Sequence, residues 1–93
     1  SKLGGYWDAK NEIDIAALDP EGKNLILGEC KYWKEPVGLN VLHALEAKAC
    51  DVAWERDRRK VWYVLFSISG FSDELRNHAA TRDDLLLIDD GER

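Results

Sequence analysis

The sequence of 93 residues predicts an α/β fold, in which helices pack on a mixed β-sheet. The pattern of polar and apolar residues predicts elements in the order strand, strand, helix, strand, helix, strand. A tight turn joins the first two strands, so we expect them to form an antiparallel hairpin. Helices connect the later strands, and such crossovers favour parallel pairing. The sheet is therefore expected to be mixed.

The first two strands are predicted from alternation and from the turn between them. Residues 12–18 alternate polar and apolar side chains at first, as a strand does. Residues 19–24 have Asp first, Pro second and Gly fourth, which are the preferences of a type I turn. Residues 24–33 are apolar on both faces at their start, which indicates a central strand.

The later elements follow from helical spacing and capping residues. Asn40 is predicted to cap a helix over residues 40–54, which carries an apolar stripe. Residues 61–66 form a predicted buried strand, and Ser72 is expected to cap a short helix. Residues 85–88 are expected to form the last strand.

Length and composition indicate a single domain over residues 1–93. The chain lacks Met and starts at Ser1, so we expect it to be a fragment of a larger protein. The net charge of −5 argues against a large nucleic-acid footprint, because phosphate contacts dominate that affinity. It argues less against a metal site, whose carboxylates add negative charge.

Two cysteines without short spacing indicate buried free thiols in a reducing compartment rather than a metal motif or a disulfide framework. The sequence contains no apolar run near ~18 residues and no signal peptide. We therefore expect a soluble, cytoplasmic domain without a membrane partner.

Three residues on the predicted hairpin form the candidate catalytic site, namely Asp14, Glu29 and Lys31. If Asp19 faces Asn24 across a loop of four residues, Asp14 faces Glu29 with Cβ atoms about 4.5–5.5 Å apart. Two carboxylates at that separation repel unless a cation lies between them.

A different turn would give a different site. If the loop has three residues and a bulge at Gly22, Asp14 faces Gly28 instead. Glu29 would then point to the opposite face unless a second bulge restores it.

In the first register, Asp14 and Glu29 are expected to bind Mg2+ or Mn2+, which prefer oxygen ligands. Lys31 would orient or deprotonate the attacking water, or stabilise the charge that develops on a phosphate. The alternative is that these three residues form a structural ion pair with one acid exposed. Glu12 is either a third acid or a partner for Lys31.

The residues of the hairpin resemble two motifs of the PD-(D/E)xK nuclease superfamily. Residues 12–18 resemble its acidic second strand, and residues 27–31 resemble its (D/E)-x-K strand. Residues 36–38 and the helix after them, residues 69–72, and residues 86–89 resemble two branches of the superfamily. These are the Mrr-like restriction endonucleases and the nuclease-like domain at the C-terminus of archaeal-type AAA ATPases.

The ATPase-linked branch is the closer of the two over residues 28–33 and 65–71. The resemblance implies a restriction-endonuclease-like fold and metal-dependent hydrolysis of DNA. It also implies Asp14 and Glu29 as metal ligands, Lys31 as the catalytic lysine, and an ATPase domain upstream in the parent chain. A polar residue on the helix after the motif points at the active site in this superfamily. Lys48 holds such a position, although a solvated surface lysine is the alternative.

The chain departs from the superfamily at its start. The superfamily core normally begins with a helix, and the residues ahead of Gly4 leave no room for one. We therefore expect the first core helix to be missing. A second hypothesis follows, namely a non-catalytic interaction or DNA-binding module of an ATPase. Such a module would associate with a partner or with itself, as a homo-oligomer, through the surface that the missing helix would cover.

Overall fold

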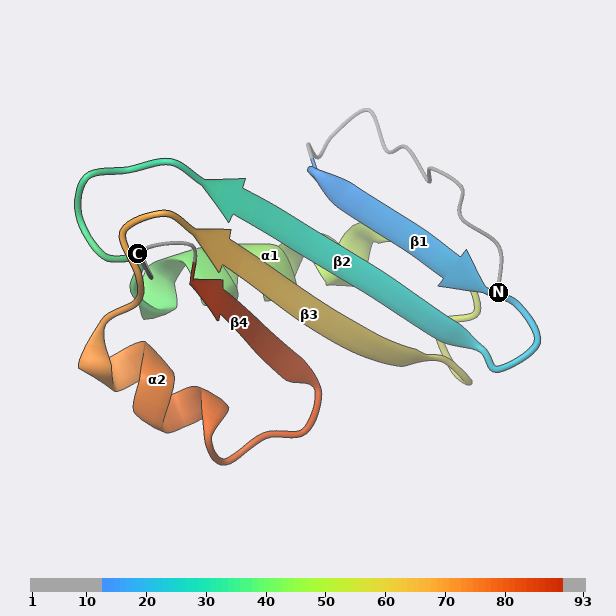
Figure 1. The fold of residues 1–93 in the computed structure, drawn as a ribbon. Coiled ribbons are helices and arrows are strands. Elements are labelled where there is room, and N and C mark those ends of the chain that lie inside the picture. The colour runs from blue at the N-terminus through green and yellow to red at the C-terminus, as the bar shows by residue number, and fades with distance from the viewer. Residues whose placement is uncertain (1–12, 90–93) are drawn as a thin grey trace.

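The computed structural model describes residues 13–89 and has the predicted order of elements (Figure 1). Two helices accompany a sheet of four strands, so the expected α/β fold with a mixed sheet is confirmed. The expectations for Glu12 and for a missing first core helix concern residues 1–12, which lie outside the described residues. The elements are β1 (Ile15–Asp19), β2 (Asn24–Lys31), α1 (Leu39–Asp51), β3 (Lys60–Ser67), α2 (Asp73–Ala79) and β4 (Leu85–Asp89).

The strands lie side by side in chain order, β1-β2-β3-β4. β1 pairs antiparallel with β2, whereas β2, β3 and β4 are parallel. The carboxyl ends of these three strands therefore meet at one edge of the sheet, where the arrowheads of β2, β3 and β4 lie in Figure 1, whereas β1 points the other way. Open α/β sheets place their ligands at this kind of edge.

The hairpin has the register with the four-residue loop. Asp19 lies opposite Asn24 and Ile15 lies opposite Gly28, which excludes the bulged alternative. The Asp19 carboxylate accepts hydrogen bonds from the Asn24 side chain (3.0 Å) and from the Gly22 backbone (3.3 Å). These bonds, the Asn24 bond first, lower the pKa of Asp19. The turn is therefore held by the residue types that predicted it.

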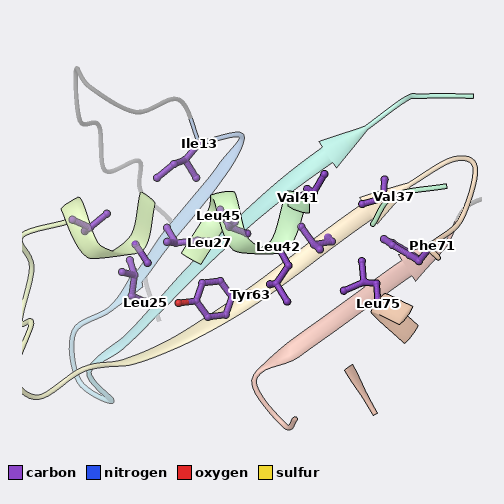
Figure 2. Close-up of a cluster of buried hydrophobic side chains, with 13 residues drawn as sticks. Ile13, Leu25, Leu27, Val37, Val41, Leu42, Leu45, Tyr63, Phe71 and Leu75 are labelled. Carbon is purple, nitrogen blue, oxygen red and sulfur yellow. The ribbon is translucent and has the colours of Figure 1, made fainter. Parts of the chain in front are cut away.

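One face of the sheet packs against α1, as Figure 2 shows. Leu42 and Leu45 of α1 are fully buried against Leu25 and Leu27 of β2 and Leu65 of β3. Burying each such leucine contributes about 1.5–3 kcal/mol. α2 adds one buried residue, Leu75, to the same core, so both helices bury their apolar residues on this side of the sheet.

The opposite face of the sheet is apolar and open to solvent. Ile15, Leu86 and Ile88 are 40%, 56% and 38% exposed. The register places Ile15 and Leu86 in one row across the sheet, with Gly28 and Val64 between them. A hollow of about 530 Å³ lies on the described surface, and its apolar lining includes Ile26, Trp62, Val64 and Leu86.

The expectation that Asn40 caps α1 is wrong. Gly38 is the N-cap residue, with extended backbone and no side-chain capping bond, and Asn40 is the second residue of the helix. The helix starts earlier because Leu39 packs against the core and enters the first turn. For α2 the expectation is confirmed, since the Leu75 backbone N–H donates to the Ser72 hydroxyl at 3.1 Å.

α1 ends at Asp51, three residues before the expected Trp54, and the C-cap residue Val52 has an extended backbone. Arg59 donates to the carbonyl oxygens of Ala49 (2.7 Å), Val52 (2.7 Å) and Trp54 (2.8 Å). Carbonyl groups at a helix end have no partner within the helix, so this guanidinium satisfies them. Arg59 is thus a structural residue of the charged connector.

A second arginine ties α1 to the entry of β4. Arg82 bonds both oxygens of Asp84 (2.8 and 3.0 Å) and reaches Glu46 of α1 at 2.8 Å. The Arg82 hydrogen bond lowers the pKa of Asp84, and the two carboxylates raise the pKa of Arg82. Tyr63 lies beneath this guanidinium, and burial raises the pKa of its phenol.

Within residues 13–89, no helix is both long enough and apolar enough to cross a membrane.

Candidate functional site

Glu29 is the buried carboxylate of the candidate site. It lies near the carboxyl end of β2 and is 6% exposed. The register places it beside Leu65 of β3, on the face that α1 covers. Burying an ionised carboxylate is costly unless a charge or hydrogen bonds compensate it. The residues around Glu29 therefore show how its charge is compensated and whether it can have a role besides a structural one.

The compensating charge comes from Lys48 in the last turn of α1. Its Nζ lies 2.7 Å from Oε2 of Glu29, and the Lys48 side chain is 27% exposed. Lys48 was one of the candidate residues, and the structure brings it to Glu29. A buried pair of this kind needs good geometry to offset desolvation, and the short distance satisfies that requirement.

Lys31 lies two residues further along β2, at its last position. Its row across the sheet contains Ser67 of β3 and Asp89 of β4. The Lys31 Nζ lies 5.1 Å from the centre of the Trp33 ring, within the range of a cation–π contact. Glu29 therefore forms its ion pair with Lys48, and Lys31 lies over an aromatic ring.

Asp14 lies in a bend just before β1, and its side chain is exposed. Strand pairing stops at Ile15, one residue short of the predicted pairing of Asp14 with Glu29. The Asp14 Oδ2 instead accepts a hydrogen bond from the Cys30 backbone N–H at 2.9 Å. The chain bends because Ile13 is buried in the core. Asp14 thus contacts β2 at the residue directly after Glu29.

A cavity of about 200 Å³ adjoins Glu29 on the α1 side of the sheet. Glu29, Lys31 and Lys48 all line it, whereas Asp14 is not part of its lining. The other lining residues are Trp33, Asn40, Val41 and Ala44.

Trp33 and Asn40 were not among the predicted site residues. Asn40, Ala44 and Lys48 follow one another at intervals of four, which places them on one side of α1. That spacing is a sequence signal which would have placed Asn40 on the same side of the helix as Lys48. The position of Trp33 carried no such signal, because it depends on the path of the chain after β2.

The donor chemistry of Asp14 and Glu29 fits a hard divalent cation. Mg2+ is usually held by one or two carboxylates and keeps several waters. An ionised carboxylate offers about four lone-pair positions, so one hydrogen bond leaves capacity on each side chain. Within residues 13–89, no group of three or more His, Cys, Asp or Glu side chains is arranged to hold a metal. Waters and substrate oxygens would have to complete the coordination.

The chain matches one protein-family model, over residues 1–58. The family is described as archaeal and bacterial proteins of unknown function. The matched part includes β1, β2 and α1, and therefore all four of Asp14, Glu29, Lys31 and Lys48. No curated protein and no solved structure matches the chain.

Proposed function

The chain belongs to DUF234, a family of archaeal and bacterial proteins of unknown function, and we propose that it is a nuclease-like domain. It would hydrolyse phosphodiester bonds of DNA with a divalent cation, Mg2+ or Mn2+. One observation carries this proposal. A buried carboxylate and two lysines line a single cavity at the carboxyl end of β2, one of the three parallel strands of the mixed sheet.

The carboxylates have separate roles in this proposal. Asp14 and Glu29 would hold the cation from adjacent chain segments, and Lys48 would keep Glu29 oriented. The bound cation would supply Lewis-acid stabilisation of the phosphate and a more acidic water. The hydrogen bond from the Cys30 backbone fixes the Asp14 carboxylate beside β2, which supports its use as a ligand.

Lys31 would act on the substrate. Lys31 is the last residue of β2, so its ammonium group lies at the carboxyl end of the strand, over the Trp33 ring, rather than in the core. From there it would bind a phosphate oxygen or orient the attacking water. Its contact with Trp33 is weak enough to be exchanged for a phosphate contact, since an exposed cation–π pair contributes about 0.5–1 kcal/mol.

The proposal also includes the parent chain and the cellular compartment. The resemblance to the nuclease-like domain of archaeal-type AAA ATPases supports an ATPase domain upstream in the parent chain. Cys30 and Cys50 are free thiols, which supports a reducing, cytoplasmic compartment. Their expected burial is wrong, since Cys30 is only partly buried and Cys50 is exposed.

The Lys31→Met variant tests the role of the lysine. We expect it to reduce Mn2+-dependent cleavage of a mixed-sequence DNA by at least about a hundredfold, because the ammonium group acts on the reacting phosphate. The matched control is Lys34→Met, which removes an exposed lysine three residues away. Equal cleavage by both variants would contradict the assignment of Lys31.

The open face of the sheet favours a second candidate function, a non-catalytic interaction module. Ile15, Leu86 and Ile88 form exposed apolar surface of the kind that marks protein interfaces. On this hypothesis the chain self-associates through that face. Sedimentation should then give a dimer or larger species for the wild type and a monomer for Leu86→Glu. A wild-type monomer at high concentration would rule out self-association.

A further inference from the structure

Two large aromatic side chains are exposed where β2 ends. Tyr32 is 69% exposed and Trp33 is 41% exposed, whereas Tyr63 and Phe71 are buried in the core. Trp33 also lines the cavity that contains Glu29, Lys31 and Lys48. An indole ring that is partly open to solvent thus borders the candidate catalytic site.

The backbone that carries Trp33 is held against the neighbouring strand. The Ser69 hydroxyl donates a hydrogen bond to the Trp33 carbonyl oxygen. The Ile68 backbone N–H donates to the carbonyl oxygen of Lys31 at 3.3 Å, directly before this segment. The Ser69 backbone N–H in turn donates to the Ser67 hydroxyl at 3.2 Å. The ring therefore projects from an anchored segment, which reduces the entropy lost when a flat ligand binds it.

Positive charge lies next to this ring. The Lys31 Nζ is 5.1 Å from the ring centre, and Lys48 lines the same cavity. A flat aromatic group beside an ammonium group matches the chemistry of a nucleotide, which joins a flat base to an anionic phosphate. Proteins that bind single-stranded nucleic acid combine these same two features.

We propose that Trp33 is a stacking platform for an unpaired base of the DNA substrate, next to the phosphate that Lys31 contacts. This inference rests on the proposed nuclease function and narrows its substrate class. Bases inside a duplex are covered by their neighbours, so only an unpaired base reaches the indole. The substrate is therefore DNA with a single-stranded segment at the site of cleavage.

The test is binding of a fluorescein-labelled ten-nucleotide oligo(dT), measured by anisotropy in EDTA on the intact chain. We expect Trp33→Leu to weaken binding about tenfold, because one stacking contact is lost. Trp33→Phe should bind within about twofold of the wild type, since it keeps an aromatic face. A duplex of the same length should bind all three proteins equally. Trp62→Phe is the control, because Trp62 lies on the opposite face and its indole bonds Asn24 at 2.8 Å.

Tryptophan emission gives a second measurement that does not depend on the leucine variant. Oligo(dT) should quench the wild-type emission, and Trp33→Phe should lose that part of the quenching while still binding. Unchanged affinity in Trp33→Leu, or an equal loss for single-stranded and duplex DNA, would overturn the stacking proposal.

Both measurements omit the metal, so they separate this inference from the proposed function. If Trp33→Leu binds oligo(dT) as the wild type does, and the wild type cleaves DNA, the nuclease proposal stands and the stacking proposal for Trp33 is wrong. If stacking is found but Mn2+-dependent cleavage is absent, the chain binds single-stranded DNA without hydrolysing it, and the substrate-class proposal fails.

Discussion

The Glu29→Gln variant is expected to lose Mn2+-dependent DNA cleavage by at least about a hundredfold while it remains folded. Loss of a residue that merely orients a metal ligand costs about 10–100-fold, and loss of a ligand itself should cost no less. Glutamine keeps the shape of the side chain and an oxygen that accepts from Lys48, so the packing around β2 should persist. Cleavage of a labelled mixed-sequence DNA measures the rate, and circular dichroism checks the fold.

The matched control is Glu35→Gln. Glu35 is exposed in the segment after β2, and its replacement removes the same charge without touching the cavity. It should cleave at the wild-type rate. If Glu29→Gln also cleaved normally, Glu29 would be a partner for Lys48 and not a metal ligand.

The Lys48→Met variant is expected to lower the free energy of unfolding by about 2–3 kcal/mol. Removing one partner of a fully buried ion pair costs about 3–5 kcal/mol, because the other charge stays buried without compensation. Lys48 is 27% exposed, so water screens part of this effect and the loss is smaller. Urea denaturation measures the change.

The double variant Lys48→Met with Glu29→Gln should recover most of the lost stability, since it removes the uncompensated carboxylate. Lys23→Met is the control for a more exposed pair, because Lys23 lies 3.7 Å from Glu55 and their side chains are 39% and 36% exposed. The Lys23→Met variant should lose less than about 0.5 kcal/mol of its free energy of unfolding. If Lys48→Met were equally mild, the pair with Glu29 would not explain how a carboxylate is buried at this position.

The hairpin and the order of elements were predictable because local chemistry determines them. Asp19, Pro20 and Gly22 match the turn, and the Asp19 carboxylate does hold it through Gly22 and Asn24. The sequence left two lengths open for this turn, and the pairing of Asp19 with Asn24 decides for the four-residue loop. That register puts Glu29 on the face that α1 covers. Ser72 was likewise predictable as a cap, since capping is a contact between near neighbours.

The start of β1 and the start of α1 were less predictable because packing with distant residues decides them. Ile13 enters the core, so the chain bends at Asp14 and pairing ends at Ile15. Leu39 enters the core edge, so Asn40 lies inside the helix instead of capping it. Both outcomes depend on which side of the sheet α1 covers, and alternation within a short segment does not contain that information.

The sequence offered two lysines as candidate site residues, Lys31 and Lys48, but it did not show which of them pairs with Glu29. Lys31 shares a strand with Glu29, and Lys48 lies nineteen positions away in the chain. The rotation of α1 about its axis brings Lys48 within 2.7 Å, and that rotation follows from the burial of Leu42 and Leu45. The aromatic contact of Lys31 with Trp33 depends in the same way on the segment anchored by Ser69.

Mn2+ binding by isothermal titration calorimetry, on the wild type and on Asp14→Asn, tests the central claim most directly. Asparagine keeps an oxygen for the Cys30 N–H and removes only the charge, so the local structure should persist. Asp73→Asn, at the exposed start of α2, is the control for a lost charge. We expect binding by the wild type and by the control, and at least about tenfold weaker binding by Asp14→Asn. Absence of binding by the wild type, or equal binding by all three proteins, would contradict a metal site at Asp14 and Glu29.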